Sequence, residues 1–198
     1  IKQDHKVTSM AIMIAMAIDT QGQKKILAIE PMENESTDTW TVFFESLKTR
    51  GLSTVDLIVS DAHKGIQAAI KPLFTGSTWQ RCKVHFMRNV LARVPHKHKK
   101  GVGRALSLIF TQESYKEAQL CALEVIEKWG KTLPDSMNVL SEGLEDALQF
   151  FNFPELPTLR ITSTNHLERL NKEIRRRSHV VGTFPSIGSF LRLIGSYL

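Results

Sequence analysis

Two acidic residues stand where a carboxylate could take part in chemistry. Asp61 directly follows an apolar run at residues 55–60, which is rich in β-branched side chains and predicts a buried strand. In open α/β sheets, ligands and reacting groups lie in the crevice at the carboxyl ends of the strands, so Asp61 is a candidate site residue. Asp is also a favoured N-cap, and Asp61 could instead cap a helix that begins at Ala62.

Glu168 is the second candidate, in the stretch ITSTNHLERLNKEIRRRS at residues 161–178. The leucine and isoleucine residues of this stretch recur at helical spacing, and Glu168 falls on a neighbouring, polar face. Asn165 and Glu168 have the spacing of a capping box, which by itself favours a capping role. Pairing with Asp61 allows a second interpretation, in which both carboxylates belong to one site. Glu173 is the alternative acid on the same helix.

Cys82 and His85 form a Cys-x-x-His pair that could belong to a zinc site. Such a pair supplies two ligands, whereas a structural zinc ion needs four. His96 and His98 could complete the set, but they lie in a basic run that predicts a loop. We therefore favour a packing or site-shaping role for the pair near the strand-end acid. Cys82 and Cys121 show no repeated spacing, which predicts reduced thiols rather than a disulfide framework.

The net charge of +6 is unevenly distributed along the chain. Residues 81–104 carry eight Lys or Arg and no acid, residues 105–157 carry three against nine acids, and residues 158–198 carry seven against two. Charge runs are usually solvated helix faces, but two basic blocks around an acidic segment favour a nucleic-acid track. The candidate phosphate contacts are Arg81, Lys83, Arg88, Arg93, Lys97, Lys99, Lys100, Lys172, Arg175, Arg176 and Arg177.

The spacing of apolar residues predicts a mixed α/β fold around these side chains. Strands are expected at residues 6–18, 24–30, 55–60 and 79–82, and helices at 36–51, 62–73 and 84–94. Residues 96–100 (HKHKK) predict a loop, followed by helices over 102–111, 113–131 and 134–151. We expect a core in two parts, residues 1–95 and 158–198, separated by a helical insertion at residues 96–157.

Membrane and secreted classes do not fit the composition. The longest apolar run, residues 10–18, is too short to cross a bilayer, and no basic region leads into a cleavable signal. The sequence therefore predicts a protein of the cytoplasm that does not associate with membranes.

Three long strings carry a family resemblance: SDAHKGIQAAI, GSTWQRCKVHFMRNVLARVP and TNHLERLNKEIRRRSHVVGTFPS. They closely resemble the Mutator-type transposases of bacterial insertion sequences, and the resemblance covers nearly all of the chain. It implies a DDE recombinase, with two Asp and one Glu on a ribonuclease H-like mixed sheet and an all-helical insertion before the Glu. By motif, Asp61 matches the second acid, Glu168 the third, and Cys82 and His85 the family's Cys-x-x-His signature.

The first acid of the family has no counterpart in this sequence. In the family it stands on the first strand, several residues before the segment that residues 1–7 resemble. We therefore expect the chain to begin just after it, with the first strand and the upstream DNA-binding region largely missing. Asp4 has a polar, turn-like setting and is not assigned this role. The expectation is a chain that alone does not cleave DNA. The alternative is an inactive remnant that binds DNA or a full-length partner.

The resemblance also implies the chemistry. Such enzymes cleave transposon ends and transfer the 3′-hydroxyl strand to target DNA with two Mg²⁺ (or Mn²⁺) ions, for which carboxylates are suitable ligands. Asp61 and Glu168 are the expected catalytic and metal-binding residues. The auxiliary residues are His63, Cys82, His85, Asn165 and Arg169. The expected partners are terminal repeats and target DNA, with a homo-oligomer formed by the full-length protein near the bacterial nucleoid.

Overall fold

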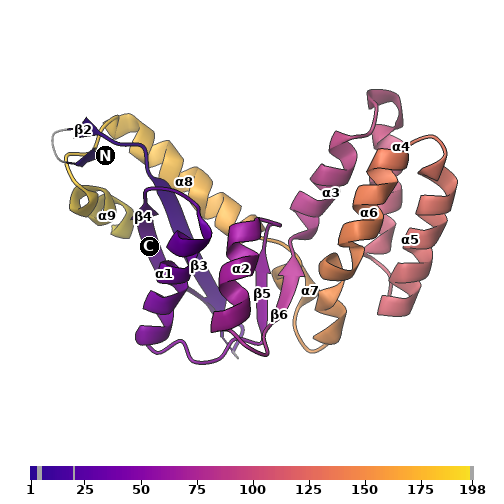
Figure 1. Cartoon of the computed structure of the whole chain (residues 1–198), viewed down its shortest axis with the longest axis horizontal. Helices are drawn as coiled ribbons and strands as arrows, with labels where there is room; N and C mark the ends of the chain where they lie inside the picture. Colours follow the sequence, from indigo (N-terminus) through magenta and orange to yellow (C-terminus); the bar gives the residue numbers. More distant parts are fainter. Residues whose placement is uncertain (4–5, 20, 197–198) are drawn as a thin grey trace. The chain divides into compact units, whose positions relative to one another are not determined.

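The computed structural model describes residues 1–3, 6–19 and 21–196 (Figure 1). The chain divides into two compact units. Unit 1 comprises Ile1–Val55, Lys64–Thr75 and Asn165–Leu198, and unit 2 comprises Asp56–His63 and Gly76–Thr164. The chain therefore passes between the units four times. Both candidate acids lie close to such a passage in the sequence.

The described residues of unit 1 form two antiparallel strand pairs and four helices. The strands are β1 (Lys2–Gln3), β2 (Lys6–Val7), β3 (Ala11–Ile18) and β4 (Lys24–Met32), and the helices are α1 (Thr37–Thr49), α2 (Lys64–Leu73), α8 (Asn165–Val181) and α9 (Ile187–Gly195). β1 pairs with β2, and β3 pairs with β4 in a hairpin whose register shifts between Ala15 and Met16. The predicted first hairpin is thereby confirmed, although its first strand is divided into β2 and β3.

In unit 1, α1 packs against α2 and contacts β4, while an apolar cluster joins the α8–α9 region to the β3–β4 hairpin. Ser36 caps α1 by accepting a hydrogen bond from the Thr39 N–H. The rings of Phe44 and Phe74 then join α1 to α2 at 5.6 Å between centroids. The apolar cluster of the α8–α9 region is made by Ile174, Phe184, Phe190 and Ile194 against Ile12, Ile14 and Ile29.

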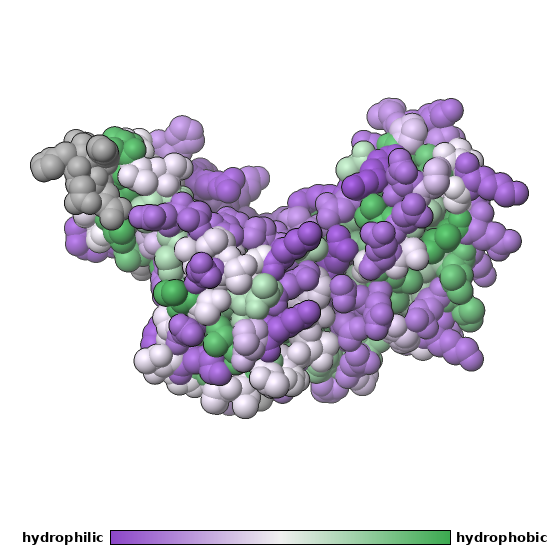
Figure 2. Space-filling view, in the orientation of Figure 1, coloured by the Kyte–Doolittle hydropathy of each residue, from purple (hydrophilic) through white to green (hydrophobic). Residues whose placement is uncertain are grey.

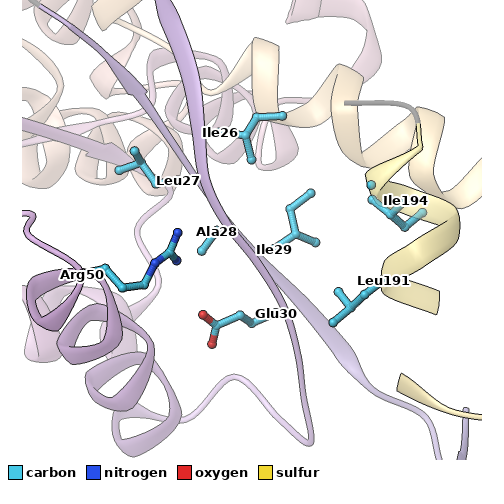
Figure 3. A pocket seen from close by; sticks show the side chains of 9 residues that line it. Ile26, Leu27, Ala28, Ile29, Glu30, Arg50, Leu191 and Ile194 are labelled. Carbon is cyan, nitrogen blue, oxygen red and sulfur yellow. The ribbon is translucent and has the colours of Figure 1, made fainter. Parts of the chain in front are cut away.

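A surface pocket of about 330 Å³ lies beside β4 in unit 1. Figure 3 shows Ile29 directed towards Leu191 and Ile194 of α9, while Glu30 and Arg50 lie on the side of α1. This separation follows from the alternation of side chains along a strand. The pocket is largely apolar and contains none of the predicted site residues.

Unit 2 combines a short parallel sheet with a helical bundle. Its elements are β5 (Leu57–Ser60), β6 (Thr78–Arg81), α3 (Lys83–Ala92), α4 (His96–Ile109), α5 (Tyr115–Gly130), α6 (Pro134–Ala147), the 3-10 helix η1 (Gln149–Asn152) and α7 (Thr158–Ile161). Helices α3 to α6 pack side by side around Phe86, Val90, Leu106, Leu140 and Leu148. Hydrophilic side chains cover much of the visible surface of this bundle, with hydrophobic ones between them (Figure 2).

Gln80 joins the parallel sheet to the end of the bundle. Its side chain is fully buried, its amide nitrogen donates to the carbonyls of Arg81 and Ala147, and its amide oxygen accepts the Phe150 N–H at 2.8 Å. A buried amide is tolerated when its donors and acceptors are matched, so this contact specifies how β6 meets α6 and η1.

The mixed α/β class is confirmed, with a mainly helical chain and small sheets. The loop predicted at residues 96–100 is wrong, because α4 begins at His96. Side-chain packing explains why residues 96–100 are helical. His98 lies edge-on to Trp129 with ring centroids 5.4 Å apart, and Val102 and Leu106 continue the same face into the core. Within the described residues, no helix is both long enough and apolar enough to cross a membrane. The domain boundaries at residues 95 and 157 stay a prediction.

Candidate active site

Asp61 lies exposed at the carboxyl end of β5, as predicted from the apolar run that precedes it. The following helix, α2, begins at Lys64 rather than Ala62, so the residue before the helix is His63 and not Asp61. Asp61 therefore does not occupy the N-cap position of α2, which argues against the capping role. The Nδ1 atom of His63 is buried and has no hydrogen-bond partner among the described residues.

Ser60 and Trp79 fix the end of the strand that carries Asp61. The Ser60 hydroxyl accepts a hydrogen bond from the Trp79 indole N–H at 2.9 Å and donates to the Asp61 carbonyl at 2.8 Å. Trp79 lies on β6, whose register with β5 places Ser60 opposite Arg81. Sequence reasoning missed this role of Ser60, because a serine before an aspartate gives no local sign of a distant tryptophan.

Glu168 lies partly buried in the first turns of α8, beside a surface pocket that it lines with Asn165, Arg169 and Lys172. Asn165 is the first helical residue, which puts Leu167 at the third helical position. Glu168 is therefore one position beyond the place where a capping-box acid stands.

Asp61 belongs to unit 2 and Glu168 to unit 1. Their meeting at one phosphate therefore stays a prediction. Each carboxylate has the chemistry that Mg²⁺ prefers, an oxygen donor reachable from solvent. No cluster of three or more His, Cys, Asp or Glu side chains suited to a metal ion occurs in the described parts of either unit. Asp4 lies outside the described residues.

Cys82 is fully buried at the end of β6, and its described contacts are hydrogen bonds. Its sulfur accepts bonds from the backbone N–H and the hydroxyl of Thr164, each at 3.4 Å. Its own N–H donates to the Ser60 carbonyl at 2.7 Å. His85 lies one turn into α3 and is partly buried. The cysteine thus joins the strand-end region to the segment just before α8, which fits the predicted site-shaping role.

The predicted DNA-contacting cations of unit 2 differ in exposure. Lys97, Lys99 and Lys100 are exposed in the first turns of α4. Arg88 is exposed on α3, and Arg93 is exposed at its C-cap. Arg81 and Lys83 are partly buried, and burial lowers the pKa of both side chains. The Arg81 guanidinium lies over the Phe86 ring at 4.7 Å.

The cations of unit 1 lie along α8. Arg169, Lys172 and Arg175 are exposed, whereas Arg176 and Arg177 form ion pairs with Glu173. These two arginines lower the pKa of the Glu173 carboxyl from its usual 4.5 to about 2. Because Glu173 is already paired with these two arginines, it is a weaker candidate than Glu168 for the catalytic acid.

Comparison with known proteins identifies the family of this chain. The profile described as "Transposase, Mutator family" matches residues 1–198. The chain belongs to the Mutator family of transposases. It is 40% identical over 188 residues to the transposase of insertion sequence ISRM5 from Rhizobium meliloti, covering 95% of this chain and 47% of the relative.

Other Mutator-family relatives match in the same way. The transposase of IS256 in transposon Tn4001 from Staphylococcus aureus is 37% identical over 204 residues, covering all of this chain and 51% of the relative. The transposase of IS1081 from Mycobacterium tuberculosis is 34% identical over 198 residues, covering all of this chain and 48% of the relative. The predicted family is confirmed, and the chain spans about half the length of the curated relatives it matches.

Proposed function

We propose that this Mutator-family chain forms part of the catalytic core of a DDE transposase, which cleaves transposon ends and joins the 3′-hydroxyl strand to target DNA. The family match over residues 1–198 carries the proposal. By the resemblance of their motifs, Asp61 at a strand end and Glu168 at the start of a helix match the second and third acids of that family. Both are ionisable oxygen donors accessible to solvent.

Asp61 and Glu168 would hold the divalent ions of this reaction. Two such ions activate the attacking oxygen and stabilise the leaving oxygen of a phosphodiester. Other residues of the chain hold the backbone that carries these two carboxylates. The hydrogen bonds of Ser60 fix the backbone at Asp61, and Ile174 anchors α8, the helix of Glu168, in the core of unit 1. Arg169 and Lys172 beside Glu168 would attract the phosphate backbone.

We also propose a ribonuclease H-like arrangement for the complete core. The antiparallel β3–β4 pair and the parallel β5–β6 pair are each only two strands wide, and such pairs gain stability within a larger sheet. In this arrangement, helices α4 to α6 lie in the predicted insertion at residues 96–157, between the second and third acids. A crystal structure of a complete transposase carrying this segment would test it, and two separate sheets there would refute it.

The catalytic proposal is tested in the complete transposase that contains this segment. Asp61→Asn and Glu168→Gln should each abolish Mg²⁺-dependent cleavage of a terminal-repeat duplex while DNA binding is retained. Asp56→Asn and Glu142→Gln are matched controls, because both acids are exposed and lie outside the family motifs. Cleavage at the normal rate by either site variant would overturn the assignment of that acid.

We expect the 198 residues alone not to cleave DNA, because the family resemblance implies a third carboxylate in addition to Asp61 and Glu168. Mg²⁺-dependent nicking of a terminal-repeat duplex by the purified chain would contradict this. The second candidate function, an inactive module that binds DNA or a full-length partner, is favoured by the exposed cations on α4 and α8. Assembly of the complete protein as a homo-oligomer on paired DNA ends is part of the first proposal.

DNA binding can be tested on the chain itself by fluorescence anisotropy over a salt series. Each neutralised phosphate contact should lower the slope of log K against log salt by about 0.9. Arg175→Ala should have this full effect, because Arg175 is exposed. Arg176→Ala should have a smaller effect, because Glu173 already pairs with Arg176. An affinity that does not change with salt would indicate a ligand other than DNA.

A further inference from the structure

The segment that leads into α8 is attached to the two residues that follow β6. The Lys83 N–H donates to the Thr162 carbonyl at 2.9 Å, and the Cys82 sulfur accepts the N–H and the hydroxyl of Thr164. Thr162 is fully buried and Ser163 nearly so. Three consecutive residues are therefore held against the end of the strand, although about 80 residues of sequence separate the two partners.

Cys82 occupies a position where a different residue would be expected. It is the N-cap of α3, a place that favours Ser, Thr, Asp or Asn because their oxygens accept hydrogen bonds from the helix. Cys82 makes no such cap, and its sulfur faces Thr164 instead. A buried thiol of this kind is chemically inert, so a packing and hydrogen-bonding role accounts for it better than reactivity.

The same residue is bonded to the strand end that carries Asp61. The Cys82 N–H donates to the carbonyl of Ser60, the residue before Asp61. On the other side, Thr164 is followed at once by Asn165, and Glu168 comes four residues after Thr164, about one helical turn. Cys82 is thus hydrogen-bonded both to Ser60, the neighbour of Asp61, and to Thr164, four residues before Glu168.

We propose that Cys82 is a positioning residue, which holds Thr164, the residue before α8, against Ser60, the residue before Asp61, through its hydrogen bonds to both. The inference rests on the proposed function, since positioning matters only if both carboxylates serve one metal site. Cys82 does not touch the reacting atoms. It defines where the backbone before Glu168 leaves unit 2, and a change there displaces the carboxylate without removing it.

The test uses isotope-labelled 198-residue chain and two measurements. Amide hydrogen exchange reports on the Thr164 N–H, and broadening of the Asp61 and Glu168 signals by Mn²⁺ reports on the metal site. Cys82→Ala should speed exchange of the Thr164 amide by about fivefold, the effect of one hydrogen bond. It should weaken Mn²⁺ binding by about tenfold, as supporting residues around metal ligands do.

Rescue and control variants separate positioning from general stability. Cys82→Ser keeps a small acceptor and should restore most of the Thr164 protection and of the Mn²⁺ affinity, whereas Thr164→Val should weaken both. Cys121→Ala removes the other thiol, partly buried on α5, and should change neither. If Cys82→Ala does not fold, Cys82→Ser and Thr164→Val decide the matter, because each preserves the shape of the site.

The outcomes distinguish this inference from the proposed function. If Mn²⁺ broadens the Asp61 and Glu168 signals of the wild type and equally those of Cys82→Ala and Thr164→Val, the positioning role is refuted and the metal site stands. If Mn²⁺ does not affect the two signals of the wild type together, the proposed function fails. The positioning role at that site fails with it, and exchange at Thr164 then shows whether the contact itself forms.

Discussion

Replacing Gln80 with leucine should destabilise unit 2 strongly. The substitution keeps a side chain of similar size but removes the partners of the buried Ala147 carbonyl and Phe150 N–H, both of which Gln80 bonds at 2.8 Å. Each buried group left without a partner costs about 1–3 kcal/mol, so two cost about 2–6 kcal/mol. The added apolar contact of leucine offsets part of this. We expect a net loss of about 3 kcal/mol, equivalent to an unfolding equilibrium shifted roughly a hundredfold.

Hydrogen exchange followed by mass spectrometry is the appropriate assay, because it reports on each unit of the chain separately. Peptides from α6 and η1 should exchange roughly a hundredfold faster in Gln80→Leu, while those from α1 and β4 should not change. Gln119→Leu is the matched control, since Gln119 is exposed on α5. A stability within about 0.5 kcal/mol of the wild type would refute the reasoning that the two backbone groups depend on Gln80.

Two further predictions concern the helices. Glu173→Gln should release the two arginines of α8 that Glu173 pairs with and steepen the salt slope of DNA binding by roughly one unit. The pKa of the Glu173 carboxyl is lowered to about 2, so in the wild type its ion pairs are fully formed above about pH 4.5 and are lost only as the pH falls towards 2. Anisotropy titrations should therefore show the same steepening of the salt slope in Glu173→Gln at about pH 6 and about pH 8. Gly143→Ala should cost about 1–3 kcal/mol in thermal unfolding, because a Cβ atom there would lie 2.7 Å from Phe86 Cε2. Gly103→Ala in α4, with its nearest neighbour at 3.9 Å, should be neutral or stabilising, and equal effects of the two substitutions would contradict the packing argument.

Features that depend on local sequence were predictable. The spacing of Trp40, Phe43, Phe44 and Leu47 predicts α1, and Ser36 marks its start, because both signals act within one or two helical turns. The β-branched run before Asp61 predicts β5 for the same reason. The position of Asp61 at a strand end was therefore predictable. Glu168, the proposed partner of Asp61 in the metal site, could be identified only from the family motif.

The start of α4 shows how tertiary contacts override local preference. A run of His and Lys at a helix N-terminus is unfavourable to the helix dipole, which made a loop the natural prediction for residues 96–100. The first turn is helical because His98 packs on Trp129 of α5, some 30 residues away. The available sequence signal was the apolar spacing of Val102, Leu106 and Ile109, which can be extended backwards by one turn to His98.

The end of β6 is where long-range contacts concentrate, and this explains why the site was only partly predictable. Gln80 binds α6 and η1, and Cys82, two residues later, binds the segment that precedes α8. Neither partner lies within 65 residues of the strand in sequence, so no local pattern reveals them. One short strand thus sets both the end of the helical bundle and the departure point of the Glu168 helix. Substitution of Gln80 should disturb the end of the bundle and substitution of Cys82 the segment that leads into α8, whereas substitutions of exposed residues on α5 should disturb neither.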